Sequence, residues 1–199
     1  MNQFLKLLVL PITLLLILLL FRDRIAPKEV ALNTTGITIS FYLLQAAERG
    51  VPSDTPSSKP PDAKEIQDVA RKASTLSLNE TTILWVDDNP QNQVYERKAL
   101  SALGIQFVLA ESTTEAIPLL KNQQFDVVIT DFKRADDDRG GYTLLDEVKK
   151  LPNPPPLIIY SSSASPELEA DARKRGAYAE TNMPQRLFSL AIQAVTDRK

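Results

Sequence analysis

Five short apolar runs separated by helical stretches occupy the sequence after residue 80 and restrict the fold more than any other feature. The runs are TILWV, QFVLA, FDVVIT, PLIIYS and a weaker AYAET, at residues 82–86, 106–110, 125–130, 156–161 and 177–181. Two of them are apolar on both faces, which is typical of central strands in a parallel sheet. The pattern predicts an α/β fold in which five βα units, (βα)5, form a doubly wound parallel sheet with strand order 2-1-3-4-5.

Turn and capping residues predict where the intervening helices begin and end. The signals are Asn89-Pro90 and Gly104 around the first helix, the capping box Ser112 to Glu115 before the second, Gly141 before the third, Ser165-Pro166 and Gly176 around the fourth, and Pro184 before a last helix that reaches Val195. Pro118 lies inside the second helix, where it removes one hydrogen bond, so we expect that helix to be shortened or kinked.

An uncharged run of fifteen residues, 7–21, predicts a membrane-spanning helix near the N-terminus. If Lys6 extends toward the headgroups, residues 4–21 reach roughly 27 Å as a helix, slightly less than a ~30 Å hydrocarbon core. A secretory signal peptide is the alternative, but FRDRIAPK after the run offers no small-x-small cleavage site. We therefore expect residues 1–24 to be a retained anchor.

The residues between the anchor and the apolar runs divide into three parts. In the juxtamembrane part, residues 25–50, Ile37, Ile39 and Phe41 alternate as in a short strand, and residues 42–49 fit two helical turns. Residues 51–61 are rich in Pro and Ser and predict a semi-extended linker. Residues 62–78 hold an amphipathic helix, from Asp62 to about Ser74, and a connection; this helix either rests on the next domain or serves dimerisation or signalling.

Composition removes several classes of chemistry. The chain has no Cys and no His, which excludes disulfides, thiolate nucleophiles, imidazole metal sites and Ser-His-Asp triads. Its 23 Lys+Arg and 25 Asp+Glu give a net charge of −2, which argues against a protein that neutralises nucleic-acid phosphates. Any chemistry must use carboxylates, hydroxyls and lysines, and we expect no nucleic-acid partner.

Acidic residues follow two of the predicted strands. Asp87 and Asp88 end the first strand and Asp131 ends the third, and these strands are neighbours in the expected order. A single Asp after a strand is more often a turn former or a helix cap, but here a hydroxyl, Ser161, also ends the fourth strand. Three carboxylates in one crevice need a cation, and oxygen ligands favour Mg²⁺.

These residues resemble a known family. Residues 81 to about 195 are similar to the receiver domains of bacterial two-component response regulators, a flavodoxin-like fold. The motifs that carry the resemblance are VDDNP at 86–90, VVITDF at 127–132, PLIIYSS at 156–162 and, in part, GAYAETNMP at 176–184. We assign residues 79–199 to this receiver domain.

The resemblance implies a role for each site residue. Asp131 accepts a phosphoryl group, Asp87 and Asp88 hold Mg²⁺ with Asp131 and the main-chain carbonyl of Lys133, and Ser161 hydrogen-bonds the phosphoryl oxygens. An ionised aspartate is an adequate nucleophile without a general base. Such a domain is a phosphoacceptor and not an enzyme, apart from slow self-dephosphorylation.

The sequence also departs from the family. Met183 stands where receivers carry a lysine before a cis-proline, here Pro184, and Glu180 stands at the aromatic switch position. A charge-assisted hydrogen bond contributes roughly 1.5–3 kcal/mol, so its loss should weaken phosphoryl binding or its coupling to helix motion by about ten- to a hundredfold. Lys133 or Arg134, in the long segment FKRADDDRGG, is a candidate substitute cation, although solvated loop charges are the simpler interpretation.

Two functions remain open at this point. The first is a membrane-anchored, stand-alone receiver that takes its phosphoryl group from a histidine kinase or phosphotransfer protein in trans and signals through contacts with a downstream protein. Arg22, Arg24 and Lys28 beside the anchor place it, as a single-pass protein of the bacterial cytoplasmic membrane, with the receiver facing the cytoplasm. The second is a pseudo-receiver that binds partners or acts as a membrane scaffold without phosphorylation. A homodimer is compatible with either.

Overall fold

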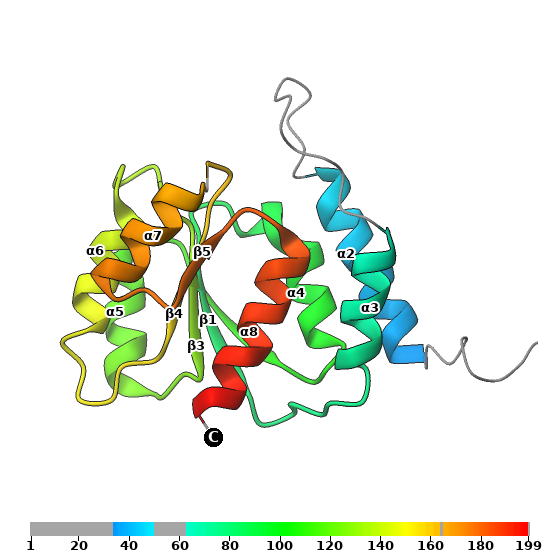
Figure 1. Cartoon of the computed structure of the whole chain (residues 1–199). Helices are drawn as coiled ribbons and strands as arrows, with labels where there is room; N and C mark the ends of the chain where they lie inside the picture. The colour runs from blue at the N-terminus through cyan, green and yellow to red at the C-terminus, as the bar shows by residue number, and fades with distance from the viewer. Residues whose placement is uncertain (1–33, 50–62, 164, 199) are drawn as a thin grey trace, which may run out of the picture. The chain divides into compact units, whose positions relative to one another are not determined.

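The computed structural model describes residues 34–49, 63–163 and 165–198, which lie in one compact unit, Asn33–Lys199 (Figure 1). A sheet of five parallel strands has the order β2-β1-β3-β4-β5, as predicted. The strands are β1 (Thr82–Val86), β2 (Gln106–Ala110), β3 (Val127–Thr130), β4 (Leu157–Tyr160) and β5 (Ala179–Thr181). The last three begin one or two residues later than the apolar runs, and the order confirms the doubly wound fold.

Helices cover both faces of this sheet (Figure 1). They are α2 (Thr34–Arg49), α3 (Ala63–Ala73), α4 (Val94–Ser101), α5 (Thr113–Asn122), α6 (Gly140–Val148), α7 (Pro166–Arg175) and α8 (Pro184–Arg198), with a 3-10 turn, η1 (Pro90–Gln93), before α4. Side chains of α5, α6 and α7 pack on one face of the sheet, and those of α4 and α8 on the other, with α2 and α3 joining the second layer.

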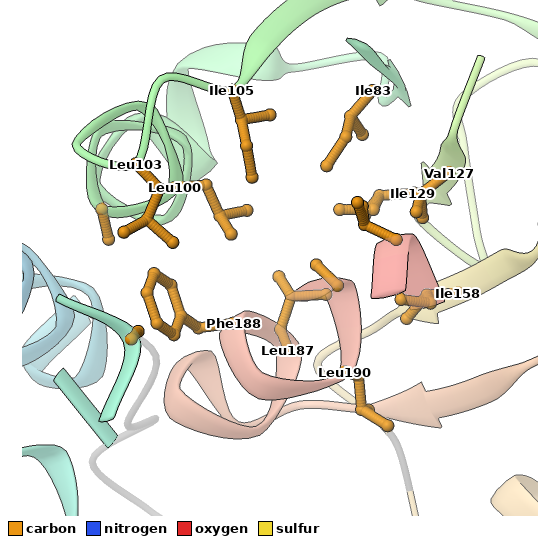
Figure 2. Packing of buried hydrophobic residues seen from close by; sticks show 14 of the residues in the cluster. Ile83, Leu100, Leu103, Ile105, Val127, Ile129, Ile158, Leu187, Phe188 and Leu190 are labelled. Carbon is orange, nitrogen blue, oxygen red and sulfur yellow. The ribbon is translucent and has the colours of Figure 1, made fainter. Parts of the chain in front are cut away.

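The strand residues alternate between two cores, as expected for a sheet buried on both faces. Leu84 and Val86 face the α5–α6 layer, whereas Ile83 and Trp85 face α4 and α8. Figure 2 shows the second core, where side chains from the sheet meet those of α4, the following loop and α8. The residues labelled there are Ile83, Leu100, Leu103, Ile105, Val127, Ile129, Ile158, Leu187, Phe188 and Leu190.

Helix α2 corrects one sequence prediction. The expected strand around residues 37–41 is part of a continuous helix of 16 residues. Ile39 and Leu43 are fully buried in the α4–α8 core, whereas Ile37 and Phe41 are 58% and 56% exposed. Alternation over only five residues also fits one turn of helix, and burial of positions four apart against α4 decides the outcome.

Helix α3 agrees with the amphipathic helix expected from Asp62 to about Ser74. Its apolar residues Ile66, Ala70 and Ala73 are buried in the core that contains α8, so it rests on the neighbouring domain. The predicted anchor and linker, residues 1–24 and 51–61, lie outside the described residues. Within the described ranges, no helix has the length and apolarity needed to cross a membrane.

Two local predictions concern residues at prolines. Helix α5 contains Pro118 and continues through it to Asn122, so the helix does not end there. Asn89 does not cap the next helix with its side chain; a 3-10 turn starts at Pro90 and the α-helix begins only at Val94. The side chain of Asp87 instead accepts a hydrogen bond from the Asn89 N–H at 2.7 Å.

Candidate functional site

A crevice of about 580 Å³ opens at the carboxyl ends of β3 and β4. Because parallel strands end at one edge of the sheet, the residues that follow them meet there. Asp131 follows β3 and Ser161 follows β4, and both line the crevice. The lining is completed by Ala46, Arg49, Asn92, Gln93, Glu96, Tyr160, Ser162 and Asn182.

Asp131 has the most strongly perturbed carboxyl group of this site. Burial and, next, the negative charge of Asp87 raise its pKa from 3.8 to about 6, against a lowering hydrogen bond from the Phe132 N–H to Oδ1 at 2.7 Å. Its own N–H donates to the carbonyl of Val86 in the neighbouring strand. At neutral pH the group is therefore ionised but poorly compensated, which suits a nucleophile that attacks an electrophilic phosphorus.

The acidic pair after β1 occupies two different environments. Asp87 is buried, and desolvation raises its pKa despite the hydrogen bond from Asn89. Asp88 is exposed, and its Oδ2 accepts a hydrogen bond from the Ala135 N–H at 2.7 Å. The structure thus places both near Asp131, since each raises the pKa of that group, but Asp88 is held by the loop after β3.

The donor chemistry of Asp87 and Asp131 fits Mg²⁺. Burial raises the pKa of both carboxyl groups, and so do neighbouring negative charges, that of Asp88 for Asp87 and that of Asp87 for Asp131. A cation would neutralise this charge, and one or two carboxylates with a carbonyl and waters suffice for Mg²⁺. In the described ranges, however, no three acidic side chains are grouped closely enough to hold a metal. The bond between Asp88 and Ala135 explains why the expected group of three is not assembled here. The main-chain carbonyl of Lys133 stays a predicted ligand.

Ser161 follows β4 and lines the crevice with Asp131. It is buried, its N–H donates to the Thr181 carbonyl at 3.1 Å, and its Oγ lies 3.2 Å from the Oγ of Ser163. This oxygen also accepts a long hydrogen bond from the Ser163 N–H at 3.4 Å. A hydroxyl with such partners can exchange them for a phosphoryl oxygen.

The family's lysine position carries no charge in this chain. Met183 is 41% exposed, and its N–H donates to Thr181 Oγ1 at 3.1 Å. All peptide bonds in the described ranges are trans, so the cis bond that the resemblance implied before Pro184 is absent. Glu180, at the aromatic switch position, is 2% exposed; burial, followed by the charges of Asp171 and Glu169, raises its pKa.

The two candidate substitute cations differ sharply. The ammonium of Lys133 is exposed and pairs with Asp138 at 2.8 Å. Arg134 is 2% exposed, and its Nη1 donates to Thr130 Oγ1 at 2.7 Å and to the Asp131 carbonyl at 3.1 Å. Its Nη2 donates to the Thr113 hydroxyl. Arg134 therefore lowers the pKa of Asp131 from a fixed position behind it.

Sequence reasoning missed a second carboxylate in the crevice. Glu96 of α4 is buried, and its Oε1 accepts a hydrogen bond from the Tyr160 hydroxyl at 2.8 Å. Burial raises its pKa above the ordinary value. No signal in the sequence separates Glu96 from other helical glutamates, because its role depends on β4 lying beside α4.

Residues 83–180 match the model of the response regulator receiver domain family. The transcriptional regulatory protein ZraR of Escherichia coli K12 is 33% identical over 95 residues, which are 48% of this chain and 21% of ZraR. A gliding motility regulatory protein of Myxococcus xanthus is 30% identical over 118 residues, 58% of this chain and 15% of that protein. The matched part thus spans about a fifth or less of these relatives.

Solved structures agree on the fold. The receiver domain of the Francisella response regulator 1452 superimposes with a TM-score of 0.53 at 22% identity, covering 60% of this chain and 99% of that one. A CheY-like receiver domain protein from Methanospirillum hungatei JF-1 gives 0.51 at 24% identity, covering 59% and 95%. The sheet and its helices thus have the fold of these receiver domains, and residues 83–180, called the receiver segment below, are the part that matches the family model. Helices α2 and α3 precede this segment.

Proposed function

We propose that the receiver segment accepts a phosphoryl group on Asp131 and so serves phosphorelay signal transduction. The observation that carries this proposal is the position of Asp87 and Asp131 at the carboxyl ends of neighbouring strands, where burial and neighbouring acidic charges raise the pKa of both carboxyl groups. A scaffold has no need for such a costly pair. Because the chain contains no histidine, a phosphohistidine donor must belong to another protein, a histidine kinase or a phosphotransfer protein.

The transfer requires little from the protein beyond position and charge. One oxygen of the Asp131 carboxylate forms a bond to phosphorus, while the bond from phosphorus to the donor's nitrogen or oxygen breaks and the donor keeps that electron pair. The product is an aspartyl phosphate. Ser161 Oγ would leave Ser163 and hydrogen-bond a phosphoryl oxygen. When Mg²⁺ is bound, it neutralises charge on the phosphoryl oxygens; Asp87, Asp131 and the Lys133 carbonyl would hold it, with Asp88 joining if it leaves Ala135.

The membrane link belongs to the same proposal. The uncharged run at residues 7–21 supports a single-pass anchor, and the adjacent positive residues support a receiver on the cytoplasmic side of a bacterial membrane. Output would pass to another protein, in line with the slightly acidic composition. Labelling a Ser57→Cys variant in intact cells tests this topology, since the chain has no other cysteine. Labelling by an impermeant reagent would contradict it.

A second function, phosphorylation-independent partner binding, is favoured by Met183 and Glu180. No ammonium stands at position 183, and a buried acid replaces the aromatic switch. One experiment separates the two functions. The purified chain in detergent is incubated with Mg²⁺ and acetyl phosphate, and acid-labile phosphate is measured on the wild type and on Asp131→Asn. Phosphate on the wild type alone supports the phosphoacceptor, whereas none on either supports the pseudo-receiver.

A further inference from the structure

The phosphoacceptor crevice is bounded by a helix that lies outside the receiver segment. Ala46 and Arg49, in the last turn of α2, line it together with Asp131 and Ser161. Of all the lining residues, which also include Glu96, only Arg49 carries a positive charge. The crevice therefore combines two carboxylates with one guanidinium.

The other cations close to Asp131 are already engaged. Arg134 is buried against Thr130, and Lys133 pairs with Asp138 at the surface. Arg97 donates to the Pro90 carbonyl, and its guanidinium lies 5.5 Å from the centre of the Trp85 ring. In the described ranges, Arg97 Nη1 and Arg134 Nε are buried without a hydrogen-bond partner. None of these three residues lines the crevice, however, so Arg49 is the cation that faces it.

The packing of helix α2 on α4 fixes the position of the main chain at Arg49. Ile39, Leu43 and Ala46 are buried in the contact of this helix with the α4 layer, and Tyr42 stacks on Tyr95 of α4 with ring centres 6.2 Å apart. These contacts hold the last turn of α2 beside the crevice. The segment before the receiver thus contributes to the same compact unit.

The side chain of Arg49 is exposed and able to reorient. Its guanidinium carbon lies 4.4 Å from the centre of the Tyr95 ring, and a cation–π contact at an exposed site contributes only about 0.5–1 kcal/mol. Glu96, the buried carboxylate beside it, has an Oε2 without a hydrogen-bond partner in the described ranges. A guanidinium with five donors can bridge such a carboxylate and a phosphoryl group.

We propose that Arg49 is the phosphoryl-binding cation of this site and replaces the ammonium that Met183 lacks. This rests on the proposed phosphoacceptor function. A phosphoryl group on Asp131 adds negative charge to a crevice that already holds Glu96. The Arg49 guanidinium leaves the Tyr95 face, enters the crevice and pairs with the phosphoryl oxygens. Because α2 carries this residue, phosphorylation also engages the N-terminal helices.

The test uses the full chain in detergent, saturated with Mg²⁺ and titrated with beryllofluoride, a phosphoryl mimic, while Trp85 fluorescence is followed. Trp85 reports on the site because its ring contacts that of Tyr160, which precedes Ser161.

The variants test the charge of Arg49. Arg49→Ala should weaken beryllofluoride binding by roughly ten- to a hundredfold, and Arg49→Lys by less. Lys98→Ala is the matched control, since Lys98 lies 5.8 Å from the same Tyr95 ring and does not line the crevice. Met183→Lys should tighten binding by a larger factor in the Arg49→Ala protein than in the wild type, because only there does the new ammonium supply a cation that the site lacks.

The outcomes separate the two proposals. A wild type that neither binds beryllofluoride nor takes phosphate from acetyl phosphate overturns the phosphoacceptor function and this inference with it. If the wild type binds and Arg49→Ala binds equally well, only the role of Arg49 is overturned. An equal loss in Lys98→Ala also overturns it, because the loss would then come from the contact of α2 with α4 as a whole.

Discussion

Gly140 leaves the space that the Arg134 guanidinium occupies: a β-carbon at Gly140 would lie 2.6 Å from Cζ of Arg134. The buried guanidinium cannot move without giving up its hydrogen bonds to Thr130 and Thr113. We expect Gly140→Ala to lower the free energy of unfolding by roughly 1–3 kcal/mol, through overpacking and lost hydrogen bonds. Urea unfolding measures this change.

A double-mutant cycle checks the cause. In an Arg134→Ala background the clash is absent, so Gly140→Ala should cost much less there than in the wild type. Equal costs in the two backgrounds would mean that the glycine is required by the backbone at the start of α6, and the interpretation of this pair would be wrong.

Asp131 should make the protein less stable as the pH rises. Its pKa is about 6 in the folded protein and 3.8 without the fold, so between these values the folded state binds more protons and its stability falls with pH. Above pH 6 the carboxyl group is ionised in both states, and the protein keeps the full loss of stability that this group causes. Asp131→Asn should therefore be more stable than the wild type at pH 7, by roughly 1–3 kcal/mol, and equally stable near pH 3.5. Urea unfolding at both pH values measures it, with the exposed Asp146→Asn as a control that should show no such difference.

Glu180 should also make the protein less stable as the pH rises, because its carboxylate is buried without a partner. Its Oε2 is buried without a hydrogen-bond partner in the described ranges, and burial and the charges of Asp171 and Glu169 raise its pKa. The free energy of unfolding is highest when this carboxyl group is protonated, and it falls as the pH rises through the pKa that the group has in the folded protein. Glu180→Gln should raise the free energy of unfolding at pH 7 by roughly 1–2 kcal/mol. Glu80→Gln, which removes an exposed carboxylate, is the control and should not raise it; a gain there would point to general charge reduction.

The hydrogen bond from Tyr160 to Glu96 should stabilise the wall of the crevice. Tyr160→Phe leaves a buried carboxylate without its 2.8 Å partner, at an expected cost of about 1–3 kcal/mol at pH 7. The bond lowers the pKa of Glu96, so its loss raises that pKa further and the cost should shrink in acid. Thermal unfolding at pH 7 and pH 4 measures both effects. Replacing Glu96 by Gln in the Tyr160→Phe protein should recover part of the loss, and no recovery would exclude the carboxylate as the cause.

The sequence was sufficient for the sheet because strands such as β1 and β3 are buried on both faces and read as continuous apolar runs. It was insufficient for α2, where Ile37, Ile39 and Phe41 alternate by chance and contact with α4 decides the structure. The positions of Asp87 and Asp131 follow from strand order, which is a property of the fold class.

The environments of the site residues needed the tertiary structure. Arg134 lies in a charged loop, and nothing local indicates that Thr113, Thr130 and Gly140 enclose it. Arg49 is more than eighty residues from Asp131 in the chain and reaches the same crevice only because α2 packs on α4. Charges brought together by three or more elements cannot be found from periodicity or spacing.

A lysine at position 183 should strengthen phosphoryl binding. Met183 follows β5 by two residues, beside the edge where Asp131 and Ser161 end their strands, and its side chain is 41% exposed, so an ammonium can be accommodated there without burial. We expect Met183→Lys to tighten beryllofluoride binding in Mg²⁺ by roughly ten- to a hundredfold, the worth of one charge-assisted hydrogen bond. Titration followed by Trp85 fluorescence measures it, and Met183→Gln, similar in length but neutral, is the control that should bind as the wild type does. Equal affinities for the lysine and glutamine variants would mean that the charge at position 183 does not reach the phosphoryl group in this chain.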